Sequence, residues 1–208
     1  IGFTTYTSGG KAVIQTEVAT VGAAGTAGAS GTNPGGNGGT VTLVNGGVAL
    51  ANAAPSTAAD SVSLHKSRPT DSRFDFGSDS RFRLTVAYTT DADQEILTIC
   101  GSEAAHSYGF ILDDGVLSGM AQTASGSRSK VTIIPSITTD IFYVLDARFF
   151  PETGKCLFYV DGVLKGSVSS NLPSTNNTIL WSAAVLTDNT TQKAMKMWDI
   201  EIMQKRFK

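Results

Sequence analysis

The sequence predicts an all-β protein, an antiparallel two-sheet jelly-roll sandwich with a Gly/Ala-rich N-terminal arm. Two stretches, 108–119 and 155–166, share one pattern in which an apolar run is broken by Asp-Gly and resumes at once. Asp-Gly is typical of a two-residue hairpin turn, because both central positions of that turn need positive φ. Helical periodicity is hard to find, and the short apolar runs end at Gly, Asp, Asn or Pro. Many short strands joined by tight turns favour two packed sheets.

Strict alternation marks the clearest strand, 81–89. One face carries Phe82, Leu84, Val86 and Tyr88, and the other carries Arg81, Arg83, Thr85 and Ala87. A period of two is typical of a strand with one buried face. The run 141–150 follows the same pattern, with Tyr143, Leu145, Ala147 and Phe149 opposite a face that holds Asp146 and Arg148.

Shorter β-rich runs predict the remaining strands. They lie at 94–100, 130–134, 179–186 and 194–203, and 40–50 is predicted to form a hairpin of its own. In the last run, Trp198, Ile200 and Ile202 are expected on one side. We expect the two layers to bury between them Phe82, Leu84, Val86, Phe158, Val160 and Trp198.

The N-terminal part differs in composition from the rest of the chain. Between Gly22 and Gly39, eight of eighteen residues are glycine. Such a segment buries too little apolar surface to offset its ordering entropy, so we expect it to be held by its own domain or by neighbouring subunits. The predicted organisation is therefore 1–60 as arm, Gly-rich segment and hairpin, and 61–208 as the sandwich.

Charge and hydropathy exclude two classes of partner. The formal net charge of the 208 residues is −2, and no basic stripe matches the demands of a phosphate backbone, so nucleic acid is not expected as a partner. No apolar run approaches the ~20 residues that span a bilayer, so membrane insertion is not expected either.

Two cysteines, Cys100 and Cys156, each fall inside a predicted strand. Their spacing is not that of a metal-ligand pair, which favours two small buried hydrophobic residues. A single bridge between neighbouring strands is the alternative, and the sequence leaves it open.

The run 157–164 carries a resemblance to a known fold. It follows a strand and a Gly-containing turn, and a Trp-bearing strand and a closing apolar-acidic strand come after it. This order is similar to the concanavalin A-like lectin and glucanase fold, and within it to laminin G-like modules. Phe74-Asp75-Phe76-Gly77 fits the same pattern, so the resemblance extends from near Ser72 to the end of the chain.

The resemblance also bears on catalysis. Retaining glucanases of this fold are similar in placing Glu, Asp and Glu at alternate positions of one strand, whereas here Met197 stands in the place of the first carboxylate, before Asp199 and Glu201. The two histidines, His65 and His106, suggest no catalytic triad, and no zinc-ligand cluster is present in the sequence. We therefore expect no enzymatic activity.

Relatives by fold are similar in holding calcium with loop carboxylates and carbonyl oxygens. Asp113, Asp114 and Asp161 are the calcium candidates here. The same Asp-Gly pairs are what a hairpin turn requires with no ion present, and turn chemistry is the favoured interpretation. No other cofactor is expected.

Ligand contact, if any, is expected in loops near one sheet. Aromatic rings stack on sugars, and amide side chains bond to sugar hydroxyls. The candidates are Tyr108, Asn171, Asn176, Asn177 and Trp181.

Two functions fit the sequence. The Gly/Ala/Thr arm joined to a laminin G-like sandwich resembles bacteriophage virion proteins. That resemblance implies a non-enzymatic structural or adhesion protein of a large assembly, a capsid decoration protein or fibre, oligomeric, at the virion or extracellular surface. The alternative is a secreted carbohydrate-binding module. The expected partners are other subunits and glycans.

Overall fold

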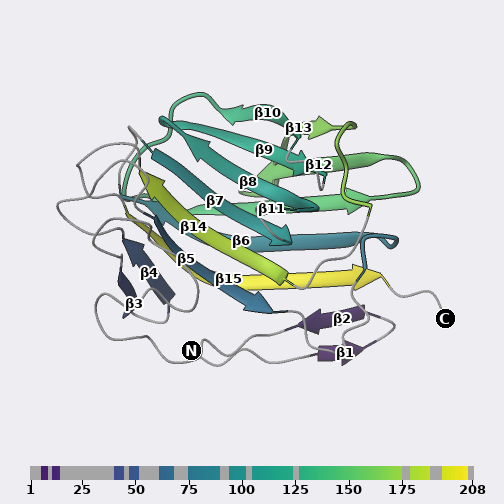
Figure 1. Ribbon diagram of the computed structural model, residues 1–208, viewed down its shortest axis with the longest axis horizontal. Coiled ribbons are helices and arrows are strands. Elements are labelled where there is room, and N and C mark those ends of the chain that lie inside the picture. Colours follow the sequence, from purple (N-terminus) through teal and green to yellow (C-terminus); the bar gives the residue numbers. More distant parts are fainter. Residues whose placement is uncertain are drawn as a thin grey trace.

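In the part of the chain that it describes, the computed structural model contains fifteen strands and no helix. It describes residues 6–8, 11–14, 40–44, 47–51, 61–67, 75–89, 94–101, 105–123, 127–174, 179–187 and 194–205. The strands form two antiparallel sheets, one in front of the other in Figure 1. The predicted all-β, antiparallel two-sheet sandwich is confirmed.

The larger sheet has nine strands. Seven follow one another in the order β1 (Tyr6–Ser8), β2 (Lys11–Ile14), β15 (Ala194–Lys205), β6 (Ser80–Tyr88), β11 (Tyr143–Phe150), β12 (Lys155–Val160) and β13 (Val163–Val168). The other two, β3 (Thr40–Val44) and β4 (Gly47–Ala51), form a hairpin that joins β15 through β4. The hairpin predicted at 40–50 is thereby confirmed.

The smaller sheet has six strands. Their order is β10 (Arg128–Ile134), β9 (Val116–Gln122), β8 (Ser107–Asp113), β7 (Gln94–Gly101), β14 (Ile179–Thr187) and β5 (Ser61–Ser67). Leu97, Ile99, Ile111, Met120 and Ala184 form a small buried cluster of their own, separate from the main core. β7 and β8 therefore bury both of their faces, which leaves no apolar-polar alternation in their sequences.

Both Asp-Gly turns have the backbone that the sequence predicts. φ is 46° at Asp114 and 79° at Gly115, between β8 and β9. It is 51° at Asp161 and 80° at Gly162, between β12 and β13. Two successive positive values are those of a type I′ turn, whose twist matches that of the flanking strands.

The main core lies between the two sheets and consists of every second residue of the facing strands. Five of the six residues predicted there, Phe82, Leu84, Val86, Phe158 and Val160, are buried in it. Aromatic rings meet across the sheets: Phe110 and Phe158 pack edge to face with their centroids 5.8 Å apart. The inner faces predicted for 81–89 and 141–150 are thus confirmed by the burial of β6 and β11, whereas Ala87 and Asp146, assigned to the outer faces, are buried as well.

The sixth residue, Trp198, departs from the prediction. The pairing of β15 with β6 shifts by one residue between Trp198 and Glu201, and Asp199 has a φ of 50°. This bulge lets Met197 and Ile200 both face the core, so Trp198 turns outward and its ring contacts exposed Phe142. Placing Trp198 on the side of Ile200 and Ile202 was wrong, because a regular alternation does not anticipate a bulge.

Two strands from the stretch 1–60, β2 and β4, pair with the same edge of β15 at different places along it. β4 pairs with residues 194–197 and β2, which also pairs with β1, with residues 202–205. The β3–β4 and β1–β2 pairs therefore lie at opposite ends of β15 (Figure 1). The Gly-rich segment 22–39 lies outside the described residues. The division of the chain at residue 60 stays a prediction.

The two cysteines are free and fully buried in opposite sheets, Cys100 on β7 and Cys156 on β12. The interpretation as small buried hydrophobic residues is confirmed. Burial raises the pKa of Cys100 to about 12, so this thiol stays protonated at neutral pH.

The close approach of the sheets at Gly119 gives a test of the core. A methyl group at this position would overlap the ring of Phe158 in the facing sheet. Gly119→Ala should therefore lower the free energy of unfolding by about 1–3 kcal/mol, measured by urea denaturation. Ser167→Ala, on an exposed position of β13, is the control and should change it by less than about 0.5 kcal/mol. Equal stability of the two variants would contradict this packing.

Candidate functional site

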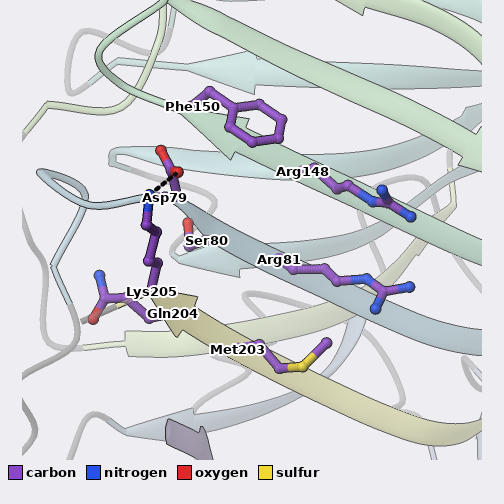
Figure 2. A pocket seen from close by; sticks show the side chains of 8 residues that line it. All are labelled: Asp79, Ser80, Arg81, Arg148, Phe150, Met203, Gln204 and Lys205. Carbon is purple, nitrogen blue, oxygen red and sulfur yellow. Dashed lines mark ion pairs between the residues drawn. The ribbon is translucent and has the colours of Figure 1, made fainter. Parts of the chain in front are cut away.

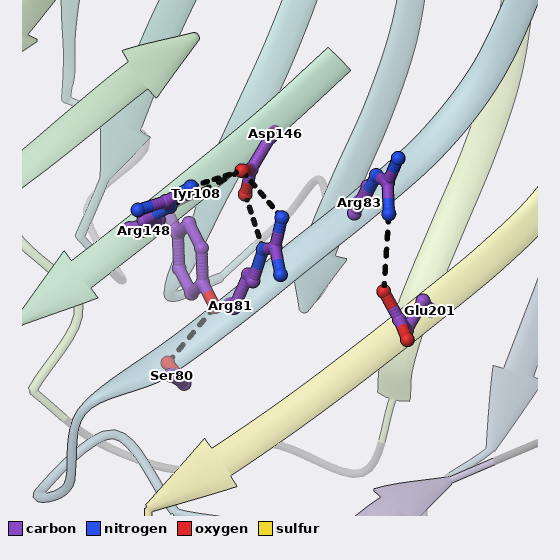
Figure 3. A network of polar contacts seen from close by, with 7 residues as sticks. All are labelled: Ser80, Arg81, Arg83, Tyr108, Asp146, Arg148 and Glu201. Atoms are coloured by element: carbon purple, nitrogen blue, oxygen red, sulfur yellow. Dashed lines mark hydrogen bonds and ion pairs between the residues drawn. The ribbon is translucent and has the colours of Figure 1, made fainter. Parts of the chain in front are cut away.

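The outer face of the nine-stranded sheet, the side away from the core, carries charged residues in aligned rows. Across β6 and β11, Arg81 lies opposite Arg148 and Arg83 opposite Asp146. Glu201 of β15 lies opposite Arg83 on its other side. We call Arg81 and Arg148 the basic row, and Arg83, Asp146 and Glu201 the paired row. Figure 3 shows both rows across the three strands.

Asp146 holds the basic row together. Arg81 donates from Nε and Nη2 to the two carboxylate oxygens, each at 2.8 Å. Arg148 donates from Nη2 and Nε to Oδ2, at 2.8 and 3.1 Å. The Asp146 side chain is 5% exposed, whereas those of Arg81 and Arg148 are 30% and 37% exposed. A buried carboxylate therefore fixes two cationic groups that solvent still reaches.

The ionisation of Asp146 depends on these two partners. Burial by itself disfavours the charged carboxylate. The hydrogen bonds from Arg81 and Arg148, together with their charges, outweigh that effect and lower the pKa of Asp146 below its usual value. The carboxylate thus stays charged at neutral pH and keeps both guanidinium groups in place.

Arg148 has a further support on the next strand. Its guanidinium carbon lies 4.2 Å from the centre of the Tyr159 ring, within cation–π distance. The group is therefore held by a carboxylate and an aromatic face at once.

An open groove lies beside the basic row, where β6 begins and β11 and β15 end (Figure 2). Its volume is about 270 Å³, and it is lined by Asp79, Ser80, Arg81, Arg148, Phe150, Met203, Gln204 and Lys205. Lys205 forms a loose ion pair with Asp79, with Nζ and Oδ2 3.7 Å apart. With Asp146 included, three cations face two carboxylates here, so the groove suits an anionic group with a partly apolar body.

The calcium candidates do not come together. Asp113 accepts from the Lys130 ammonium at 3.0 Å, and Asp161 accepts from the backbone N–H of Val144 at 2.9 Å. Asp113 and Asp114 lie at the β8–β9 turn, and Asp161 lies at the β12–β13 turn of the other sheet. Among the described residues, no three His, Cys, Asp or Glu side chains are grouped as metal ligands would be. The positions of these aspartates are those that the turns and an ion pair need.

Two of the predicted sugar contacts lie in the core. Tyr108 is in β8 and Trp181 in β14, and both are buried, with exposures of 0% and 3%. The Tyr108 hydroxyl donates to Ser80 Oγ at 2.8 Å, and burial raises its pKa well above the usual value. Expecting these two residues in loops was wrong, because both lie in the apolar runs that form β8 and β14. No ring face of either is left for a sugar.

The other predicted contacts are amides. Asn171 has a φ of 51° and donates from Nδ2 to Ser129 Oγ of the six-stranded sheet at 3.0 Å, and it does not line the groove. Asn176 and Asn177 lie outside the described residues. None of the three candidates that the structure describes, Tyr108, Asn171 and Trp181, lines the groove.

The residues considered for catalysis are also dispersed. Met197 is buried in the core, Asp199 is exposed at the bulge, and Glu201 lies 3.9 Å from Arg83. His106 is buried and its Nδ1 accepts from the backbone N–H of Ser174 at 3.2 Å. The side chain of His65 is outside the described part of the structure.

Comparison with known proteins places this chain among β-sandwich domains. No family model and no curated protein matches the sequence. Among solved structures, a sialidase superposes with a TM-score of 0.54 at 12% identity, over 79% of this chain. The receptor-binding domain of botulinum neurotoxin D superposes with a TM-score of 0.57 at 11% identity, over 81% of this chain. The binding domain of Paraclostridial Mosquitocidal Protein 1 superposes with a TM-score of 0.56 at 13% identity, over 83% of this chain. At identities this low, the superpositions show a shared fold and nothing more.

The chain corresponds to only a part of these proteins. It spans 16% of the sialidase and 43% and 44% of the two toxin domains. A further neighbour, at a TM-score of 0.55 and 11% identity, is a botulinum neurotoxin serotype D ligand-binding domain in complex with N-acetylneuraminic acid, of which the chain covers 42%. No apolar helix long enough to cross a bilayer occurs among the described residues.

The Asp146 network predicts a specific loss of stability in acid. The carboxyl pKa is lower in the folded than in the unfolded chain, so its stabilising effect is complete above the unfolded value of about 3.9 and is lost as pH falls through the folded value. Asp146→Asn removes this contribution. At pH 7 it should lower the free energy of unfolding by about 1–3 kcal/mol.

Urea denaturation from pH 7 to pH 2 measures this effect. The difference in stability between the wild type and Asp146→Asn should be constant down to about pH 4 and shrink below it. A difference that stays the same across the acid range would contradict the ion-paired state of Asp146.

Proposed function

We propose that this chain is a non-enzymatic glycan-binding β-sandwich, and that its groove on the nine-stranded sheet binds the acid group of a sugar. The observation that carries the proposal is the Arg81–Asp146–Arg148 network. Two guanidinium groups are held in fixed positions at the edge of a groove whose size suits part of a small ligand.

The two arginines keep donors for a ligand. A guanidinium has five N–H bonds, and both Arg81 and Arg148 use Nε and Nη2 toward Asp146. Both N–H bonds of Nη1 and the second N–H bond of Nη2 remain on each arginine for a carboxylate, the group whose planar shape matches a guanidinium. Because the network already fixes these side chains, binding requires little further ordering.

The structural neighbours support a glycan as the ligand class. One of them was solved with bound N-acetylneuraminic acid, whose carboxylate is the kind of group that the groove suits, and another is a sialidase. An acidic sugar also offers hydroxyls to the paired row and apolar ring atoms to Phe150 and Met203.

The use of the carboxylates on this face supports our proposal of binding without catalysis. Both oxygens of Asp146 accept hydrogen bonds from arginines, and Glu201 faces Arg83. Hydrolysis by a pair of carboxyl groups, the mechanism of most glycosidases, needs both groups aimed at one bond, and these two are engaged by arginines.

The wider role that we propose is adhesion within a large assembly. The Gly-rich arm suggests a phage virion decoration protein or fibre, located at the virion or extracellular surface. Strands from the first 60 residues already add to one edge of β15, so this part of the chain is suited to pairing with sheet edges. A laminin G-like sandwich of the concanavalin A type is compatible with the observed layers. A secreted carbohydrate-binding module is the alternative setting for the same binding site.

Calorimetric titration with 3′-sialyllactose and with neutral lactose tests the proposal. Arg148→Gln should weaken binding of the acidic sugar about tenfold or more, since a hydrogen bond to a charged group contributes about 1.5–3 kcal/mol. Arg81 continues to neutralise Asp146 in this variant, so the fold is retained.

Lys130→Gln is the matched control. It removes the same charge from the other sheet, where Lys130 pairs with Asp113, and should leave the affinity unchanged. Equal binding of lactose and sialyllactose by the wild type, or equal weakening by both substitutions, would overturn the assignment of the groove.

A further inference from the structure

An aromatic pair, Trp198 and Phe142, lies on the same outer face as the basic row. The two rings pack edge to face with their centroids 5.0 Å apart. Phe142 is 63% exposed and Trp198 is partly exposed. Exposed aromatic rings that pack together offer an apolar surface to a ligand.

The backbone is arranged to present this pair. The bulge at Asp199 turns Trp198 outward while Met197 and Ile200 stay in the core. Gly47 lies directly against the indole, because a Cβ at Gly47 would overlap the indole edge. A bulge that aims a large aromatic side chain away from the core is a feature of functional positions.

The spacing between the aromatic pair and the basic row is fixed by the register. Trp198 lies beside Thr85, whereas Arg148 lies beside Arg81, four residues earlier on β6. At about 3.3 Å per residue, the two places are about 13 Å apart along the strand. This separation exceeds the size of one sugar ring, so only an oligosaccharide reaches both.

The surface between them is polar. The paired row crosses it: Arg83 Nη1 lies 3.9 Å from Glu201 Oε2, and the two side chains are 45% and 34% exposed. A loose, exposed pair of this kind leaves donors and acceptors for hydroxyl groups.

We infer that the ligand is an acidic oligosaccharide, whose acid group sits at the basic row, whose middle lies over the paired row and whose apolar sugar face packs on Trp198 and Phe142. The inference rests on the proposed function and adds a second subsite and a minimum ligand length to it. Aromatic faces suit the C–H side of a pyranose, and a held pair of rings presents that surface without further ordering.

Titration with ligands of two lengths tests the inference. The wild type should bind 3′-sialyllactose about tenfold more tightly than free N-acetylneuraminic acid, as the extra contact with two aromatic rings implies. Phe142→Ala and Trp198→Ala should each remove most of this preference and leave binding of the monosaccharide unchanged. Val163→Ala, which truncates an exposed apolar residue at the β12–β13 turn, is the control and should preserve the preference.

The two proposals fail in different ways. If both ligands bind equally well, or if both aromatic variants keep the preference, the second subsite is wrong, while weakening by Arg148→Gln still supports the basic row. If the wild type binds neither acidic ligand, the proposed function fails and this inference fails with it. Phe142 is mostly exposed, so its truncation leaves the core intact and the result interpretable.

Discussion

Burial of every second side chain of β6 and β11 between the sheets is the constraint on which the rest of the structure depends. Because Phe82, Leu84 and Val86 must face the core, the residues between them must face outward. The antiparallel register then brings Arg81 opposite Arg148. The positions of the outer charges are therefore a consequence of how the core packs.

This placement brings two positive charges close together, and Asp146 offsets their repulsion. Like charges directly opposite one another on a sheet repel, and the basic row is such a pair. A buried carboxylate that accepts from both guanidinium groups offsets the repulsion and holds the two side chains in place. The arrangement that stabilises the outer face also keeps two positive groups in contact with solvent. In our proposal, the same contacts therefore serve both stability and ligand binding.

The sequence was a good guide wherever a local rule decides the structure. Asp-Gly predicted the turns at 114–115 and 161–162, and alternation predicted the inner face of 81–89. It failed where pairing between distant strands decides. The bulge at Asp199 contains no glycine that would have predicted it. β8 is buried on both faces, so its sequence does not show that Tyr108 faces the core. Arg81 and Arg148 come together only through the pairing of β6 with β11. The charges on the outer face were visible as alternating residues, but their grouping into a site was not.

Amide chemical-shift mapping with 3′-sialyllactose tests the central claim most directly, because it locates the ligand without substitutions. If the outer face of the nine-stranded sheet is the binding surface, the largest shifts should fall at residue 79 and at 80–85 of β6, at 146–150 of β11 and at 198–205 of β15. Shifts confined to the six-stranded sheet or to the turns at 113–115 and 161–163 would contradict the account.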